Sequence, residues 1–219
     1  MAMQRTQSIF NRIMDIFTHF LLLNVMWLVC CLPVITIFPA TTAMFAVVRQ
    51  WHLKGIDSGV FQIYISKFRE NFRKSFVIGL LWLAGGAILY FDASILLIYS
   101  FPGSSILFTM TMFLAILYGI TMPNLFLMLV NYELTILHAM KNALLLSISK
   151  ILHTLSYATI LVAGVAIVYY FPFFLFIIGS LLAFIMYHIF DKLTIQIKNQ
   201  TTNKERPNDN IIGDSPPLK

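Results

Sequence analysis

Three long stretches without a formal charge limit what this chain can fold into. They cover residues 16–48, 93–132 and 151–190, which are 33, 40 and 40 residues long. A helix that crosses a bilayer needs about 20 apolar residues. Charged residues make up 11% of the chain, whereas soluble domains carry about 25%. The sequence therefore predicts an all-α, polytopic transmembrane helical bundle.

Prolines mark where the two longer stretches turn back. "FPGSS" occupies residues 101–105 and "YFPFF" occupies residues 170–174. Proline lacks the backbone donor of a helix interior and clashes with the preceding turn, so a helix stops and reverses at such a point. We therefore expect two helical hairpins, the first over about 75–101 and 106–130 and the second over about 153–171 and 173–190.

The first uncharged stretch is interrupted by "CCLPVITIFPATTA" at residues 30–43. Its two arms, about 16–32 and 34–48, are each at the short limit for a crossing. If both arms cross, the chain has six membrane segments; the arms can also form a re-entrant loop beside four crossings. If the stretch crosses once, the chain has five segments and an external N-terminus.

Basic residues predict the orientation, because short loops rich in Lys and Arg stay cytoplasmic. Residues 49–74 hold six of the fifteen Lys and Arg residues, and the two proline turns hold none. This places the C-terminus in the cytoplasm and favours a cytoplasmic N-terminus. We expect one transmembrane domain over residues 1–198, and a polar, proline-bearing tail over 199–219 that is disordered.

Residues 60–74 combine aromatic and basic positions in a helical pattern. Aromatic residues recur every three to four positions, and cations fill the remainder. The pattern predicts an amphipathic interfacial helix whose rings lie in the acyl boundary and whose cations contact anionic lipid headgroups. A cytoplasmic partner is the alternative, and nucleic acid is not expected. The key residues are Lys67, Phe68, Arg69, Phe72, Arg73 and Lys74.

The broken segment and the basic segment together resemble the YesL family of small bacterial integral membrane proteins. The resemblance rests on an Asn-x-x-Trp helix, a Leu-Pro-Val-x-Thr-x-x-Pro-Ala-x-x-Ala break and a later Phe-x-x-x-Phe-Lys/Arg segment. A glycine would be expected before the second proline, where this chain has Phe38. The matching positions of the helix and the break are Asn24, Trp27, Leu32, Pro33, Val34, Thr36, Pro39, Ala40 and Ala43.

The resemblance implies a plasma-membrane protein of unknown biochemical function. Members of the family look like companions of carbohydrate-uptake systems in Gram-positive bacteria. The resemblance therefore implies an accessory or interaction subunit, with sugar-transporter subunits as the expected partners.

Four polar residues at membrane depth allow a different function. Asn24, Thr36, Thr41 and Asn124 lie within or beside predicted membrane segments. Such groups usually hydrogen-bond across helices, but they can also line a polar recess. The second alternative would make the chain a small secondary transporter or channel.

Enzyme chemistry is not expected. The sequence has no phosphate-binding Gly-x-x-x-x-Gly-Lys loop, no His-Glu-x-x-His metal pair and no Gly-x-Ser-x-Gly nucleophile turn. Cys30 and Cys31 are adjacent, unlike a redox or zinc pair. His188 and Asp191 share a helical face, which is a weak signal for a metal. We therefore expect no catalytic residues, no metal and no cofactor.

Overall fold

The computed structural model describes residues 2–56, 59–99 and 102–205. This part of the chain consists of helices joined by short links, and six of the helical segments are long and apolar enough to cross a membrane. The structure thus confirms the all-α, multi-pass class. The elements are α1 (Ala2–Cys31), η1 (Val34–Thr36), α2 (Ile37–Lys54), α3 (Val60–Ile98), α4 (Ser104–Asn131), α5 (Ile136–Ser149), α6 (Ile151–Tyr170), η2 (Pro172–Phe174) and α7 (Leu175–Glu205).

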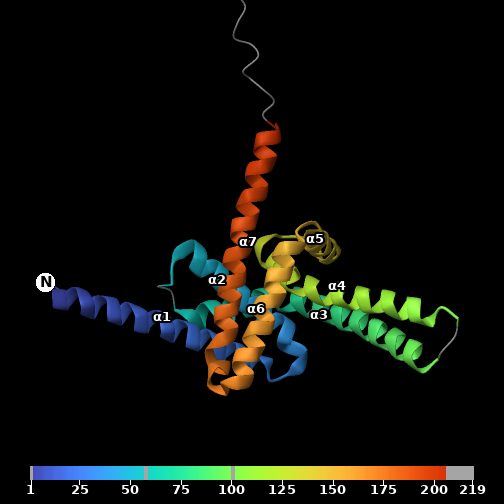
Figure 1. Cartoon of the computed structure of the whole chain (residues 1–219). Helices are drawn as coiled ribbons and strands as arrows, with labels where there is room; N and C mark the ends of the chain where they lie inside the picture. The colour runs from blue at the N-terminus through green and yellow to red at the C-terminus, as the bar shows by residue number, and fades with distance from the viewer. Residues whose placement is uncertain (1, 57–58, 100–101, 206–219) are drawn as a thin grey trace, which may run out of the picture.

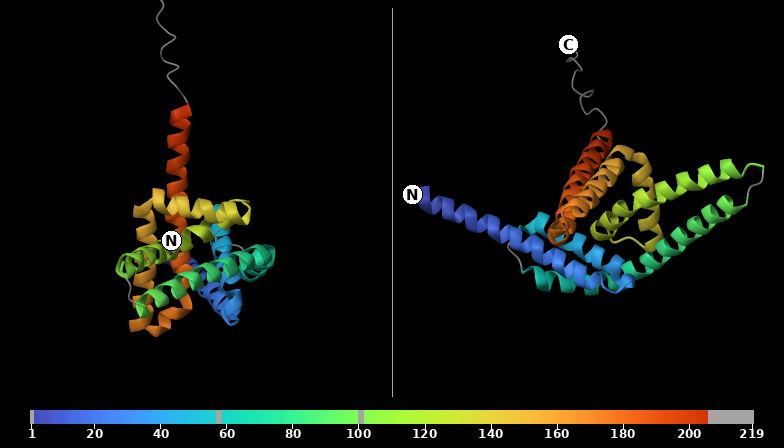
Figure 2. Two further views of the ribbon diagram at one scale, coloured as in Figure 1. Left: turned by 90° about the vertical axis from the view of Figure 1, so that its right-hand side faces the viewer. Right: turned by 60° about the horizontal axis from the view of Figure 1, so that its bottom comes forward.

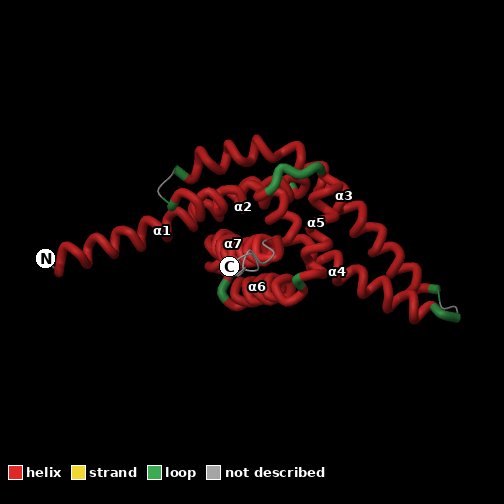
Figure 3. Tube along the Cα trace, turned by 90° about the horizontal axis from the view of Figure 1, so that it is seen from above, coloured by secondary structure: helices red, strands yellow, loops and turns green. Residues whose placement is uncertain are grey.

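The helices are arranged around a central crossing rather than as one parallel bundle. α1, α2 and α3 run back and forth beside one another, and α6 and α7 run steeply across them (Figures 1 and 3). Three parts project from the centre: the start of α1, the end of α7 and the far end of the α3–α4 hairpin (Figures 1 and 2). The core therefore lies where the remaining parts of the helices meet.

The break after α1 turns the chain back on itself. Leu32 and Pro33 separate α1 from the single turn of η1, and α2 then returns along α1 (Figure 3). Pro39 lies in the first turn of α2, where backbone N–H groups have no partner within the helix, so proline costs no hydrogen bond there. The hydroxyl of Thr36 lies 2.5 Å from the carbonyl oxygen of Cys30 and 2.6 Å from that of Pro33. The side chain of Thr36 thus reaches back across the break to the end of α1.

Phe38 explains why the glycine expected before the second proline is not needed. Its side chain is buried and packs 5.4 Å from the ring of Phe126. A Cβ at Gly79 of α3 would lie 2.7 Å from a ring atom of Phe38, so Gly79 provides the space that this ring fills. The bulky residue is in α2, and its small counterpart is in α3.

α3 corrects the predicted boundary between an interfacial helix at 60–74 and a membrane segment at 75–101. The structure has one unbroken helix over Val60–Ile98. The change at residue 74 is a change in side-chain polarity, which does not interrupt backbone hydrogen bonding. The aromatic face also differs from the expectation. Tyr64 is fully buried and donates to the carbonyl oxygen of Ala40 in α2, and Phe68 packs against the core.

The far part of the α3–α4 hairpin, residues 83–99 and 102–117, is called the distal hairpin below. Gly103, with φ of 96°, allows the turn that starts α4. Thr111 of α4 donates to a carboxylate oxygen of Asp92 in α3 over 2.6 Å. At the base of the distal hairpin, the rings of Trp82 and Tyr118 stack with centroids 3.9 Å apart. The two helices are thus joined along their length by side-chain contacts.

The end of α7 corrects the predicted start of the disordered tail. α7 continues to Glu205, so residues 199–205 are helical. Residues 206–219 of that prediction lie outside the described residues.

Candidate functional site

Asn24 joins α1 to the beginning of α7. Its side chain has no exposed surface, and its amide nitrogen donates to the carbonyl oxygen of Leu175 over 2.6 Å. Its amide oxygen accepts the backbone N–H of Ser180 over 3.0 Å. A Cβ at Gly179 would lie 2.4 Å from that oxygen, so only glycine lets the helices come this close. Asn24 therefore acts as a link between helices.

Asn124 makes a corresponding link among α4, α5 and α6. It is buried, and its amide nitrogen lies 2.8 Å from the hydroxyl of Ser147 and 3.1 Å from that of Thr154. Both hydroxyls belong to a single connected group, since Thr154 also donates to the carbonyl oxygen of Ser147. Polar contacts of this kind stabilise membrane helix packing by about 0.6 to 2 kcal/mol.

The four residues predicted as a polar recess therefore lie in separate hydrogen-bonded groups. Thr36 bonds within the break, and Thr41 accepts the indole N–H of Trp27 over 3.1 Å. Asn24 and Asn124 bond to different helices, as described above. The structure brings Trp27 together with Thr41, but it does not gather the four residues around one space.

The remaining residues of the break have two kinds of surroundings. Ala40 and Ala43 are fully buried in α2, where their small size lets neighbouring helices approach. Leu32 and Val34 are 79% and 74% exposed. The break thus has one side packed into the bundle and another side available to lipid.

An apolar cavity of about 410 Å³ lies among α1, α2, α4, α6 and α7. Trp27, Thr41, Phe126 and Gly179 are among its lining residues, and the rest of the lining is almost entirely aliphatic, aromatic or methionine. A cavity with this lining suits hydrocarbon better than a polar solute.

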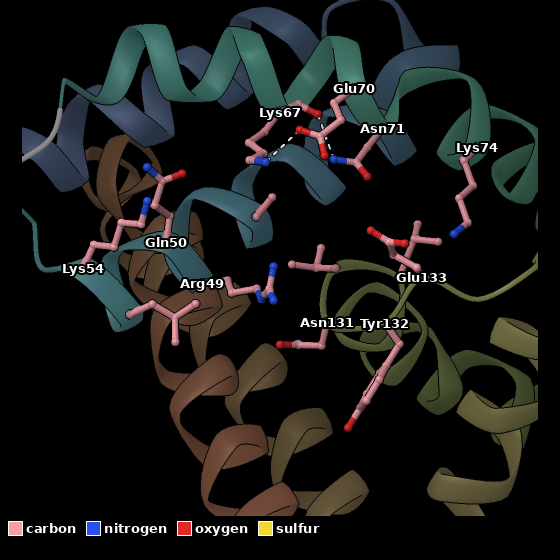
Figure 4. A pocket seen from close by; sticks show the side chains of 14 residues that line it. Arg49, Gln50, Lys54, Lys67, Glu70, Asn71, Lys74, Asn131, Tyr132 and Glu133 are labelled. Carbon is pink, nitrogen blue, oxygen red and sulfur yellow. Dashed lines mark hydrogen bonds and ion pairs between the residues drawn. The ribbon is translucent and has the colours of Figure 1, made fainter.

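A second cavity, of about 430 Å³, has the opposite character and is called the charged cavity. It lies where the end of α2, the first half of α3 and the end of α4 meet (Figure 4). α2 and α3 each contribute two cations, and α3 and the link after α4 each contribute one acid. These side chains are Arg49, Lys54, Lys67, Lys74, Glu70 and Glu133.

The charges in this cavity are only partly paired. Lys67 and Glu70 form an ion pair of 2.7 Å. The guanidinium of Arg49 lies against the hydroxyl of Tyr187 in α7, and that hydroxyl donates to Asn131 over 3.0 Å. Within the described residues, Lys54 and Lys74 form no ion pair. The cavity therefore has an excess of positive charge.

Only some of the cations that the sequence analysis assigned to one interfacial surface line the charged cavity. Lys67 and Lys74 line it, whereas Arg69 and Arg73 do not and are exposed. The spacing held this information, because residues seven apart share a helical face and residues two or six positions from Lys67 lie on the other side. Arg49 and Lys54 were missed as site residues, since nothing local shows that the end of α2 faces α3.

The histidine and carboxylate that the sequence placed on one helical face lie in the middle of α7 and face His52 of α2. Nε2 of His52 in α2 lies 3.1 Å from a carboxylate oxygen of Asp191, and the ring of His188 lies 5.7 Å from the His52 ring. Across the described part of the chain, no three His, Cys, Asp or Glu residues are grouped as metal ligands would be.

Comparison with known proteins finds one family model and one relative, and neither has a known function. A family model described as "Protein of unknown function, DUF624" matches residues 20–93, which include the break and the first three helical turns of the distal hairpin. The chain is also similar to the uncharacterized protein YesL of Bacillus subtilis (strain 168). The two are 26% identical over 168 residues, which cover 75% of this chain and 79% of the relative. No solved structure gives a significant match.

Proposed function

We propose that this chain is a YesL-like membrane protein and acts as a non-catalytic accessory subunit of a carbohydrate-uptake system. The proposal places the chain in a bacterial plasma membrane with both termini in the cytoplasm. The link to carbohydrate uptake comes from the family resemblance. The structural support is that polar residues at membrane depth hydrogen-bond between helices.

The observation that carries the proposal is that Asn24 and Asn124 each hydrogen-bond to neighbouring helices. Each is buried; both ends of the Asn24 amide bond to α7, and the amide nitrogen of Asn124 bonds to hydroxyl groups of α5 and α6. A small secondary transporter or channel, the alternative function, needs polar groups that are free to face a solute. The paired asparagines favour a packing role, so we prefer the accessory subunit.

Arg69 and Arg73 offer a surface on which a partner or anionic headgroups can bind. They are exposed and four residues apart on the face of α3 that turns away from the charged cavity. Two cations on one helical face attract an acidic segment of another protein. We propose this face as the docking surface for a transporter subunit.

Co-purification from native membranes tests this function. The full chain, carrying an affinity tag and extracted in mild detergent, is expected to retain carbohydrate-transporter subunits. Arg69→Glu/Arg73→Glu is expected to lower their recovery at least fivefold. Lys141→Glu/Lys150→Glu changes the same number of charges, on α5 and at the link between α5 and α6, and should leave recovery within twofold. Recovery of the chain alone at every detergent strength would contradict the proposal.

Cysteine labelling in intact cells tests the orientation. In a background with Cys30 and Cys31 replaced by alanine, a single cysteine at Ser104 should react with a membrane-impermeant maleimide from outside. A single cysteine at Gln62 should react only after the membrane is opened. The reverse pattern would overturn the proposed orientation.

A further inference from the structure

We propose that the charged cavity binds a phosphate ester whose remaining part carries hydroxyl groups. This site goes beyond the accessory function and does not depend on it. The phosphate group can belong to a lipid headgroup or to a free metabolite, and the chemistry of recognition is the same for both.

Charge is the first argument. The cavity gathers four cations and two acids, and the Lys67–Glu70 ion pair neutralises one of each. Arg49, Lys54 and Lys74 then outnumber Glu133. Bringing like charges together costs free energy unless a counter-charge is bound. A phosphate group supplies that counter-charge and several acceptor oxygens, and the planar fork of Arg49 suits two of them at once.

The origin of the cations is the second argument. Arg49 reaches in from α2, while Lys67 and Glu70 are held on α3 at the opposite side of the space (Figure 4). Lys74 lies one to two turns further along α3, on the same side as Glu133. A cavity whose cations come from two helices can surround a ligand, whereas a surface stripe on one helix can only contact it.

Neutral groups in the wall suggest what the rest of the ligand carries. Asn131 has both ends of its amide occupied, by the carbonyl oxygen of Leu127 and the hydroxyl of Tyr187. Gln50 and Tyr132 also line the cavity, and within the described residues their side chains have no hydrogen-bond partner. An amide and a phenol at the wall can bond to alcohol groups. The volume of about 430 Å³ is in the usual range for sites that hold a small molecule.

Binding measurements on the full chain in a neutral detergent test the site. The probes are glycerol 3-phosphate, as a free phosphate ester, and short-chain phosphatidylglycerol, with phosphatidylcholine of the same chain length as its control. Affinity is obtained from the rise in unfolding temperature as each probe is added, since a ligand that binds only the folded state stabilises it.

Two double variants with the same loss of charge make the test specific. Lys54→Gln/Lys74→Gln is expected to weaken binding of the active probe at least tenfold, and adding Arg49→Gln should weaken it further. Arg69→Gln/Arg73→Gln removes two cations from the other face of α3 and should change the affinity less than twofold. Lys67 is left in place to keep its ion pair with Glu70. Unfolding without probe is measured for each variant to show that it is folded.

The results separate the sources and can overturn the site. Binding of glycerol 3-phosphate would identify a free phosphate ester as the ligand class, and binding of phosphatidylglycerol alone would identify a headgroup. Equal losses in both double variants would show attraction to surface charge only and would overturn the proposal. Binding of neither probe would also overturn it.

Discussion

α2 and the distal hairpin are both apolar helical segments, but α2 is surrounded by other helices and the distal hairpin is largely exposed. In its most apolar stretch, α2 has 61% of its residues buried, and the corresponding stretch of α3 has none. α2 is nevertheless the less apolar of the two. Its buried face contains small residues such as Ala40, Thr42 and Ala43. In a membrane, close packing of small residues, rather than greater hydrophobicity, places a helix inside the protein.

Removing an aromatic ring that packs on α2 and one in the distal hairpin should give the largest difference in the free energy of unfolding. Phe126 of α4 is buried and packs 5.4 Å and 5.9 Å from the rings of Phe38 and Phe45 in α2. Phe126→Ala should lower the free energy of unfolding by about 3–5 kcal/mol, because it leaves a cavity in the core. The measurement is unfolding in mixed micelles of fixed composition.

Phe113, on the same helix, is the matched control. It is 68% exposed in the distal hairpin, so Phe113→Ala should cost less than about 1 kcal/mol. Similar losses for both variants would show that α2 is no better packed than the distal hairpin.

Adding a methyl group at a glycine in each region should give a smaller difference in the free energy of unfolding. A Cβ at Gly79 would lie 2.7 Å from the buried Phe38 ring, whereas a Cβ at Gly86 would lie 3.7 Å from Tyr118, an ordinary contact. Gly79→Ala should therefore destabilise the protein by about 1–3 kcal/mol. Gly86→Ala should be neutral or stabilise it by up to about 1 kcal/mol, because alanine favours a helix interior.

Thermal unfolding of the two glycine variants in one detergent checks this prediction. Stabilisation by Gly79→Ala would mean that Phe38 moves aside at no cost, and the fit between α2 and α3 would be looser than described.

The polar links should give the smallest difference. Asn24→Ala removes two hydrogen bonds to α7 and leaves the N–H of Ser180 without that acceptor, so a loss of about 1–2 kcal/mol is expected. Thr111→Val removes one bond to Asp92, which is itself exposed, and a loss of about 0.6 kcal/mol or less is expected. Unfolding in the same micelles measures both. A larger loss at Thr111 would reverse the comparison.

Sequence patterns were sufficient to predict the helical class and the proline turns, because these depend on local backbone preferences. The reversal after α1 was one of the alternatives that the sequence left open. The predicted helix end at residue 74 was wrong for a physical reason: polarity changes there, but no proline interrupts α3 between Val60 and Ile98. Polarity reports where a helix lies and not whether its backbone continues.

The partners of individual side chains could be predicted much less well. The sequence showed that Asn24 and Asn124 are polar residues at membrane depth, but their partners are 151 and 23 or more residues away. Such pairings depend on how the helices are rotated and crossed. The charged cavity was missed for the same reason, although the spacing of Lys67 and Lys74 already placed those two cations on a common face.

The continuity of α3 has a mechanical consequence. At 1.5 Å per residue, its 39 residues form a rod of roughly 58 Å, nearly twice the hydrocarbon thickness of about 30 Å. An unbroken helix bends only gently, so its two ends cannot tilt independently. When α3 turns about its packed middle, a shift of the end that carries Lys67 moves the end near Ile98 in the opposite direction.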